Sequence, residues 1–215
     1  PVGEATGLGE IRKHAAMVDR AGANATERPA HAGSIEQRDL WDAYAKHVLR
    51  FLDLNGRSIK LVVDASNGMA GTMIPKIFGK KGNAVEGLSI VELNFDNSKG
   101  EFVHEPNPLV AENLRQLQEA VVAEKADFGL CFDGDADRCV VVDETGQIVA
   151  CDHLTAVLAP WFLAKAKGST VVYDLRSSKA VEEEIVAAGG KLLKGRVGHV
   201  FMKQALAETK GIFGG

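Results

Sequence analysis

The stretch FGLCFDGDADRCVVVD covers residues 128–143 and indicates how this part of the chain folds. Its first five residues and the run Cys139–Val142 are apolar and have the length of a strand. Residues 133–138 form an acidic loop between them, and the Gly-containing segment 143–146 favours a hairpin turn before residues 147–150. The stretch therefore predicts a buried strand that ends in a loop rich in carboxylates.

Asp133, Asp135 and Asp137 stand at alternate positions in this loop. Carboxylates so close together repel one another, and at least one would be protonated unless a cation neutralised the group. Mg²⁺ favours a small number of protein carboxylates, with coordination positions left for water or phosphate oxygens. Gly134 permits a tight turn, and Arg138 adds a permanent positive charge whose geometry matches phosphate. We therefore predict a Mg²⁺ site that serves phosphate chemistry.

Other interpretations of the loop lead to different chemistry. A solvated acidic turn explains the carboxylates but not their apolar flanks. An EF-hand is excluded, because its sixth position needs Gly where this chain has Arg138, and because helices rather than strands would flank it. A haloacid-dehalogenase-type phosphatase with Asp133 as nucleophile is the second hypothesis, although such enzymes typically carry Thr or Val where this chain has Asp137. A non-catalytic module that binds sugar phosphate is the third.

Outward from this stretch, apolar strand-like runs alternate with helical segments. The further strand-like runs are 59–64, 88–94, 170–174 and 191–194, and the helical segments are 8–20, 72–79, 110–125, 152–167, 179–188 and 200–209. Such alternation predicts an α/β fold whose sheets are covered by helices on both faces. The capping-box pattern of Ser34–Gln37 predicts a further helix from there to about Asp53.

Two strand ends are similar to each other. Asp64 and Asp174 each end an apolar run, and each is followed by a short loop that contains Ser. This similarity suggests two related domains that join near residue 150.

Composition excludes several classes of protein. The chain has 215 residues, of which 46% are hydrophobic and 25% charged, as in ordinary globular proteins. The net charge of −4 argues against nucleic acid as the main partner, and no apolar run approaches the roughly 20 residues of a membrane span. Of the three cysteines, Cys131 and Cys139 lie in apolar runs, so we expect buried free thiols in a reducing cytoplasm.

Four stretches in this order resemble the α-D-phosphohexomutase family, the phosphoglucomutases and phosphomannomutases. They are Val63–Gly71, His104–Pro108, Asp133–Arg138 and Arg196–His199 followed by Phe201 and Lys203. The resemblance implies tandem three-layer α/β/α domains with mixed sheets, like the second and third of the family's four domains. It assigns residues 1–36 to the tail of domain one and a linker, 37–148 to domain two, and 149–215 to an incomplete domain three.

The resemblance also implies an activity. Family members are isomerases of carbohydrate metabolism that transfer a phosphoryl group between C1 and C6 of a hexose phosphate. An enzyme phosphoserine donates the group, and a hexose bisphosphate is the intermediate. The phosphoserine motif does not occur in these residues, so we expect a central fragment that binds Mg²⁺ but has no mutase turnover alone.

By resemblance, particular residues take particular roles. Asp133, Asp135 and Asp137 would bind Mg²⁺, and Arg138 would be an active-site arginine beside it. The remaining candidates are His199 as an acid/base or hydroxyl-orienting residue, Arg176 and Arg196 as contacts to the sugar phosphate, and Gly198 as a point of close backbone approach. Three further motif residues are interpreted as structural: His104 as a residue that fixes its loop, Ser66 as a turn residue at a helix start, and Lys203 as a helix residue.

Overall fold

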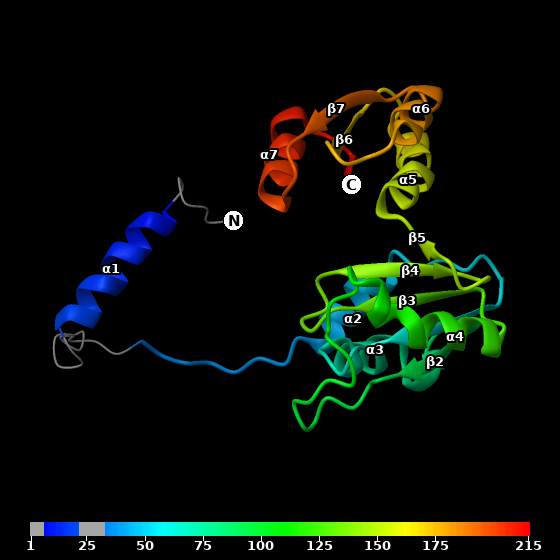
Figure 1. The fold of residues 1–215 in the computed structure, drawn as a ribbon, viewed down its shortest axis with the longest axis horizontal. Helices are drawn as coiled ribbons and strands as arrows, with labels where there is room; N and C mark the ends of the chain where they lie inside the picture. Colours follow the sequence, from blue (N-terminus) through cyan, green and yellow to red (C-terminus); the bar gives the residue numbers. More distant parts are fainter. Residues whose placement is uncertain (1–6, 22–32) are drawn as a thin grey trace. The chain divides into compact units, whose positions relative to one another are not determined.

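The computed structural model describes residues 7–21 and 33–215. The predicted linker at 21–33 and the first six residues fall almost entirely outside this part. The chain divides into two compact units, one of residues 39–157 and one that contains residues 158–215 (Figure 1). Helix α1 (Leu8–Ala21) lies where the sequence pattern predicts a helix.

The first unit is built on a mixed sheet. Its described strands are β1 (Ile59–Asp64), β2 (Leu88–Leu93), β3 (Phe128–Phe132), β4 (Cys139–Asp143) and β5 (Ile148–Val149), in the order β2-β1-β3-β4-β5. Strand β1 is parallel to both β2 and β3, whereas β4 is antiparallel to β3 and to β5. The antiparallel strands form the hairpin that the sequence predicts after the acidic loop.

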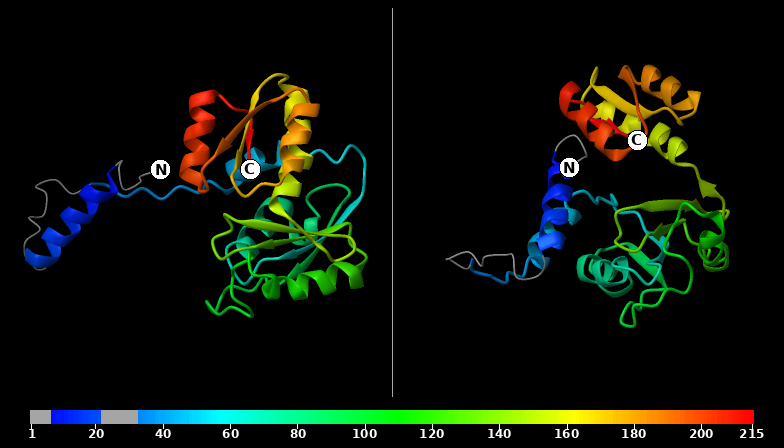
Figure 2. Two further views of the ribbon diagram at one scale, coloured as in Figure 1. Left: turned by 45° about the horizontal axis from the view of Figure 1, so that its top comes forward. Right: turned by 60° about the vertical axis from the view of Figure 1, so that its left-hand side comes forward.

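Helices cover both faces of this sheet (Figure 2). Successive strand residues point to opposite faces, so Val62 packs with Leu117 and Val121 of α4 (Arg115–Glu124) on one side. On the other side, Val63 packs with Ile74 of α3 (Ala70–Phe78). The remaining helical segments of the unit are α2 (Trp41–Leu49), η2 (Lys80–Gly82) and η3 (Ala111–Leu114). The result is a three-layer α/β/α arrangement.

The second unit repeats the scheme on a smaller scale. Its described strands are β6 (Thr170–Asp174), β7 (Lys191–Gly195) and β8 (Phe213–Gly214), in the order β7-β6-β8 and all parallel. Its helices are α6 (Lys179–Ala187), α7 (His199–Thr209) and the part of α5 (Cys151–Lys165) that begins at residue 158. The α/β class is confirmed in both units, with the mixed pairing confined to the first sheet.

Two local expectations were wrong. Residues 33–40 have no regular structure, and α2 begins only at Trp41, whose N–H donates to Asp39 Oδ1 at 3.0 Å. Ile35 is 96% exposed, so no packing supports a helix that begins at Ser34, and helices depend on such packing. Cys139 is exposed where β4 leaves the acidic loop, whereas Cys131 is buried as expected.

The parallel strands determine where a ligand would bind. The carboxyl ends of β1, β2 and β3 lie at the same edge of the sheet. Strand β1 lies between β2 and β3, so the two strands that follow β1 in the sequence flank it on opposite sides. Ligands of α/β proteins bind at such a point, beyond the carboxyl ends of the strands. The acidic loop follows β3 at this edge. Among the described residues, no helix has the length and apolar character that a membrane span requires.

Candidate functional site

The metal loop, residues 133–138, connects the end of β3 to the start of β4. Asp133, Asp135 and Asp137 each offer a carboxylate oxygen, and these oxygens all lie within 4.8 Å of one another. Asp133 is buried, with 1% of its surface exposed, whereas the other two aspartates are exposed. The structure thus brings together the carboxylates that the sequence pattern singles out as metal ligands.

Hydrogen bonds fix the orientation of the Asp133 carboxylate. Its Oδ1 accepts the backbone N–H groups of Asp137 and Arg138 at 3.0 and 3.1 Å. Its Oδ2 accepts Nε–H of the Arg138 side chain at 2.6 Å. An ionised carboxylate has about four lone-pair sites, so these three donors leave room for one further partner such as a cation.

The protonation state of Asp133 follows from the same contacts. Burial by itself raises the pKa of this carboxyl, but the Arg138 backbone and side-chain donors and the Arg138 charge outweigh it and lower the pKa overall. Asp133 is therefore ionised at neutral pH even when only Arg138 compensates its charge. The candidate metal ligands are three carboxylates, two of which are exposed. Carboxylate oxygens are suitable ligands for a hard cation such as Mg²⁺.

Arg176, at the carboxyl edge of the second sheet, is held by the residue that ends β6. Its backbone N–H donates to Asp174 Oδ1 at 2.8 Å, and its Nε and Nη2 atoms donate to Asp174 Oδ2 at 3.0 and 2.6 Å. Asp174 was not predicted from the sequence as this partner. The detectable signal was an aspartate at a strand end with an arginine two residues later, a spacing that allows a turn closed by the aspartate side chain.

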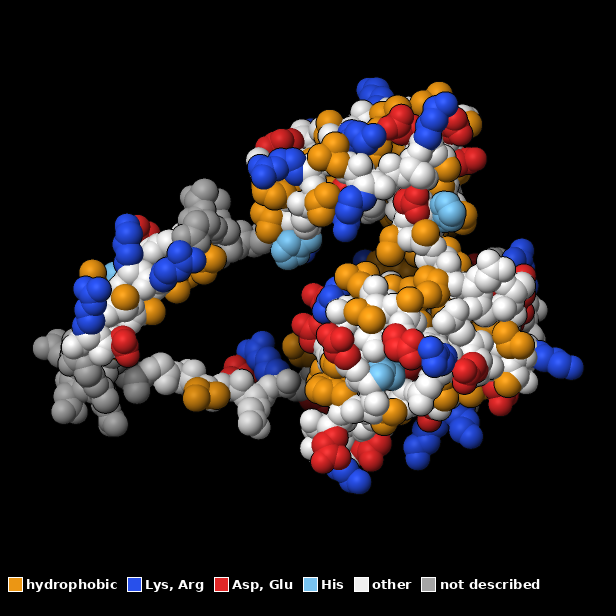
Figure 3. Space-filling model, viewed as in Figure 1, with side chains coloured by type: hydrophobic (Ala, Val, Ile, Leu, Met, Phe, Trp, Pro, Cys, Tyr) orange, Lys and Arg blue, Asp and Glu red, His pale blue; other side chains and the backbone are white. Residues whose placement is uncertain are grey.

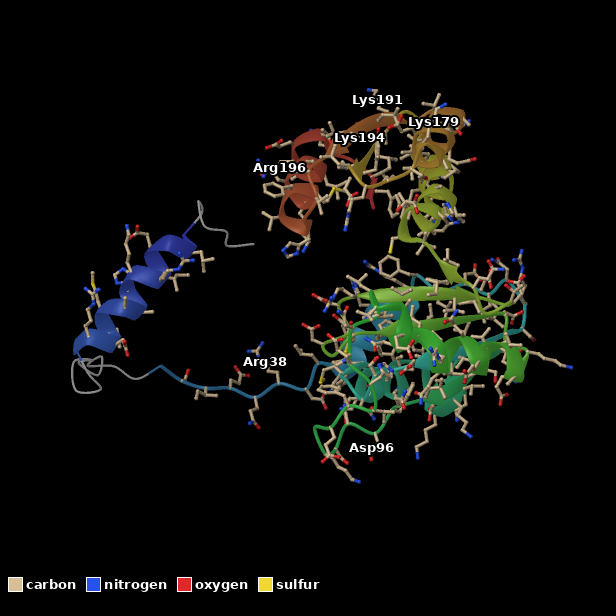
Figure 4. All side chains as sticks on the ribbon, in the orientation of Figure 1. Arg38, Asp96, Lys179, Lys191, Lys194 and Arg196 are labelled. Carbon is tan, nitrogen blue, oxygen red and sulfur yellow. The ribbon has the colours of Figure 1, made fainter. Side chains whose placement is uncertain are left out.

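The loop after β7 lies at the same edge as Arg176, because Gly195 pairs in register with Asp174. Arg196 is labelled in Figure 4. Its guanidinium lies over the Phe201 ring, 4.3 Å from the centroid. Gly198 has a φ of 126°, a value that favours glycine, and its carbonyl accepts the N–H groups of Phe201 and Met202 at the start of α7. His199 is the exposed first residue of that helix.

The predicted site residues thus fall into two groups. Asp133, Asp135, Asp137 and Arg138 belong to the first unit, and Arg176, Arg196, Gly198 and His199 belong to the second. Lys203, interpreted as structural, lies in the first turns of α7. In the space-filling view, basic side chains on the second unit are interspersed with acidic ones rather than gathered in one continuous patch (Figure 3).

The Asp174–Arg176 pair predicts an acid dependence of stability in the second unit. The hydrogen bonds from the Arg176 guanidinium lower the pKa of Asp174. Burial raises this pKa, but its effect is the smaller one. A carboxyl with a lowered folded-state pKa stabilises the fold above its unfolded value, near 3.9, and this contribution is lost as pH falls through the folded value. We expect Arg176→Ala to reduce the loss of stability between pH 7 and pH 3, measured from the urea dependence of Val171 and Val172 amide signals.

Lys179→Ala is the matched control for this prediction, because Lys179 pairs with Glu183 on the exposed surface of α6. Its acid dependence should be close to that of the wild-type chain, because both side chains of this pair are largely exposed and exposed ion pairs contribute little to stability. If the acid dependence is unchanged in Arg176→Ala, the Asp174–Arg176 pair contributes nothing to the stability of the second unit.

Comparison with known proteins gives a consistent result. The family model described as "Phosphoglucomutase/phosphomannomutase, alpha/beta/alpha domain II" matches residues 42–146, and the corresponding domain III model matches residues 150–215. The phosphomannomutase of Salmonella montevideo is 33% identical over 217 residues, which cover 100% of this chain and 46% of that protein. The phosphoglucomutase of Neisseria gonorrhoeae is 33% identical over 95% of this chain and 43% of its own length.

Solved structures show the same relation. A phosphoglucomutase/phosphomannomutase family protein from Burkholderia thailandensis matches with a TM-score of 0.78 and 33% identity, over 86% of this chain and 39% of that one. A second match is the N-acetylphosphoglucosamine mutase of Aspergillus fumigatus in complex with GlcNAc-6P and magnesium. Its TM-score is 0.55 and its identity 22%, over 80% of this chain and 36% of that one. The chain spans less than half the length of these relatives. Because models for two successive domains match in order and cover both units, the chain belongs to the α-D-phosphohexomutase family of phosphoglucomutases and phosphomannomutases.

Proposed function

We propose that this chain supplies the metal loop and a sugar-phosphate-binding loop of a phosphohexomutase. The enzyme would transfer a phosphoryl group between C1 and C6 of glucose or mannose phosphate through an enzyme phosphoserine and a hexose bisphosphate. The observation that carries the proposal is the cluster of Asp133, Asp135 and Asp137, whose ligand atoms lie within 4.8 Å of one another beyond β3. Residues 37–148 would be domain two and 149–215 part of domain three, with 1–36 from domain one.

The residues of the first unit would neutralise phosphate charge. When bound at the three aspartates, Mg²⁺ supplies positive charge that stabilises a transferring phosphoryl group. Arg138 donates its Nε–H to Asp133, and its guanidinium is half exposed. A guanidinium has five N–H donors, so donors remain for a phosphate oxygen. Arg138 therefore positions Asp133 and contacts the phosphate in this proposal.

The residues of the second unit would hold the sugar phosphate. Asp174 fixes the Arg176 side chain through two hydrogen bonds, which leaves less side-chain entropy to lose when a phosphate binds. Arg196 is oriented by its contact with the Phe201 ring. His199, exposed at the start of α7, would orient a sugar hydroxyl or exchange a proton with it. Gly198 gives the loop the conformation that places His199 there.

A known complex supports the choice of ligands. The Aspergillus fumigatus mutase described above was crystallised with GlcNAc-6P and magnesium, and a variant of the same enzyme with glucose 1,6-bisphosphate. These ligands belong to those proteins. They support Mg²⁺ and hexose phosphates as the first compounds to test on this chain.

The burial of Asp133 disfavours the phosphatase hypothesis. An aspartate nucleophile needs one oxygen exposed to the incoming phosphorus atom. Both oxygens of Asp133 accept hydrogen bonds, and only 1% of the residue is exposed. The metal-ligand role needs a single remaining lone pair, which this arrangement provides.

We expect the 215-residue chain to bind glucose 1,6-bisphosphate in the presence of Mg²⁺ and to show no interconversion of glucose 1-phosphate and glucose 6-phosphate. Binding is measured by calorimetry with and without Mg²⁺, and interconversion by ³¹P NMR. The expectation of no turnover follows from the missing phosphoserine motif.

Two outcomes would contradict the proposal. Turnover by the chain alone would show that no phosphoserine is needed. Beryllofluoride trapped on Asp133 in a crystal would instead favour the phosphatase hypothesis.

A further inference from the structure

The loop that follows β1 holds the metal loop in place. We call residues 65–69 the buttress loop. The Ser66 hydroxyl donates to the Phe132 carbonyl at 2.6 Å, and the Met69 N–H donates to the Gly134 carbonyl at 3.0 Å. These two acceptors belong to the residues on either side of Asp133. The buttress loop therefore fixes the backbone immediately before and after the buried metal ligand.

The two loops are also in close steric contact. A Cβ atom added at Gly68 would lie 2.6 Å from the carbonyl oxygen of Gly134. The backbones consequently touch with no side chain between them. A displacement of the buttress loop would be transmitted directly to the metal loop.

The buttress loop depends in turn on a buried carboxylate. Asp64 is completely buried, and its Oδ1 accepts the Ser66 N–H at 2.8 Å and the Asn94 side-chain amide at 3.0 Å. Ser66 and Asn67 have φ values of 48° and 51°. A left-handed conformation is unfavourable for serine, so it persists only where surrounding contacts hold it. Asp64 provides the contact that holds it here.

His104, from the HEPNP motif, completes this arrangement. Its Nε2 lies 3.0 Å from Asp64 Oδ2, its Nδ1 lies 2.9 Å from the Glu105 carbonyl oxygen, and its side chain is 14% exposed. The Glu105 carbonyl and the Asp64 carboxylate are both acceptors, so the ring makes the two hydrogen bonds together when both of its nitrogens carry a proton. These contacts support the interpretation of His104 as a residue that fixes its loop, and the contact with Asp64 suggests a second role.

The loop that carries His104 joins the buttress loop at further points. The Val103 N–H donates to Asn67 Oδ1 at 3.0 Å, and the Asn97 side-chain amide donates to the Gly68 carbonyl at 3.0 Å. Three loops at the carboxyl ends of β1, β2 and β3 are therefore connected through short polar contacts. Asp64 is the buried centre of this connection.

We propose that Asp64 and His104 are positioning residues of the metal centre. They fix the buttress loop, and through it the geometry of the metal loop and its affinity for a divalent cation. Neither residue belongs to the group of carboxylates within 4.8 Å of one another, so neither is a predicted ligand. If the support is weakened, the metal loop has to become ordered when the cation binds. This ordering costs entropy and therefore lowers the affinity for the cation. The inference rests on the proposed metal site.

The first test measures the affinity of the 215-residue chain for Mg²⁺ by calorimetry. Groups that hydrogen-bond directly to a metal ligand contribute a factor of about 10 to 100 to affinity, and His104 acts through Asp64 and the buttress loop, so His104→Ala should raise the Kd for Mg²⁺ several-fold, up to about tenfold. His104→Gln keeps an N–H donor that can reach Asp64 and should recover most of the loss. Val121→Ala is the control, because it destabilises the core beneath α4 without altering these loops, and its Kd should equal that of the wild-type chain.

The second test needs no metal. The amides of Asp137 and Arg138 donate to Asp133, and their hydrogen exchange should be faster in His104→Ala, while that of Gly146 in the β4–β5 turn is unchanged. If the wild-type chain binds Mg²⁺ and His104→Ala changes neither Kd nor exchange, the inference is overturned. If the wild-type chain binds no Mg²⁺, the proposed metal site is wrong. Faster exchange in His104→Ala would then still support positioning of the loop, and unchanged exchange would refute it.

Discussion

Replacing Asp135 by Asn is expected to weaken Mg²⁺ binding by this chain about 30-fold, since one unit charge near a divalent cation contributes this much even at the dielectric constant of water. The dielectric constant of water is appropriate because Asp135 is exposed on the metal loop. Asparagine has nearly the same shape, so the variant removes charge without removing volume. Calorimetric titration of both chains with Mg²⁺ at moderate salt measures the ratio of the two Kd values.

Glu144→Gln is the matched control, because it removes one negative charge from an exposed position on the β4–β5 hairpin. It also tests the excluded EF-hand, in which this glutamate would be the ligand at the twelfth position of the loop that begins at Asp133. Its Kd should differ little from that of the wild-type chain. Equal affinities of wild type and Asp135→Asn would remove any metal role for the loop, and with it the main support for the proposed function.

The metal loop could be predicted because its chemistry is local. Asp133, Asp135 and Asp137 are separated by single residues, so the sequence alone brings their carboxylates into one region whatever the rest of the chain does. The strands were predictable for a similar reason. β1, β3 and β6 have the bounds that their apolar runs predict, because a strand buried on both faces needs consecutive apolar residues.

Contacts between distant residues could not be predicted. His104 and Asp64 are 40 residues apart, and their pairing depends on how the loops after β1 and β2 fold over the sheet edge. The sequence identified both motifs, VDASNGMAG and HEPNP, but gave no sign that they meet. Asp174 and Arg176 are close in sequence, but their pairing was missed because an exposed loop arginine has many possible partners.

The start of α4 shows how a side-chain hydrogen bond can override a helical sequence pattern. The sequence pattern predicts one helix over 110–125, whereas the structure has the 3₁₀ helix η3 followed by α4. The side chain of Asn113 donates to the Asn107 carbonyl at 2.9 Å, which ties this segment to the HEPNP loop. Such side-chain bonds to nearby backbone compete with regular helix geometry.

Replacing Leu117 by Ala is expected to cost the first unit about 3 kcal/mol of stability, within the range for deleting a fully buried leucine side chain. Leu117 is completely buried, and its side chain fills the space beside Gly129 of β3, where an added Cβ would lie 2.7 Å from it. The resulting cavity would separate α4 from the strand that carries the metal loop. Urea unfolding followed by Trp41 fluorescence in a Trp161→Phe background measures the change in this unit.

Val122→Ala is the matched control on the same helix, because Val122 is 53% exposed and should change stability by no more than about 0.5 kcal/mol. Mg²⁺ affinity in Leu117→Ala, measured where the protein remains folded, should stay close to that of wild type, because α4 packs on the face of the sheet whereas the loops that support the metal site lie at its edge. A cost of less than about 1 kcal/mol would mean that α4 does not form the cover of this face. A large loss of Mg²⁺ affinity would instead mean that the position of the metal loop is set by packing beneath β3 rather than by the contacts of Asp64 and His104.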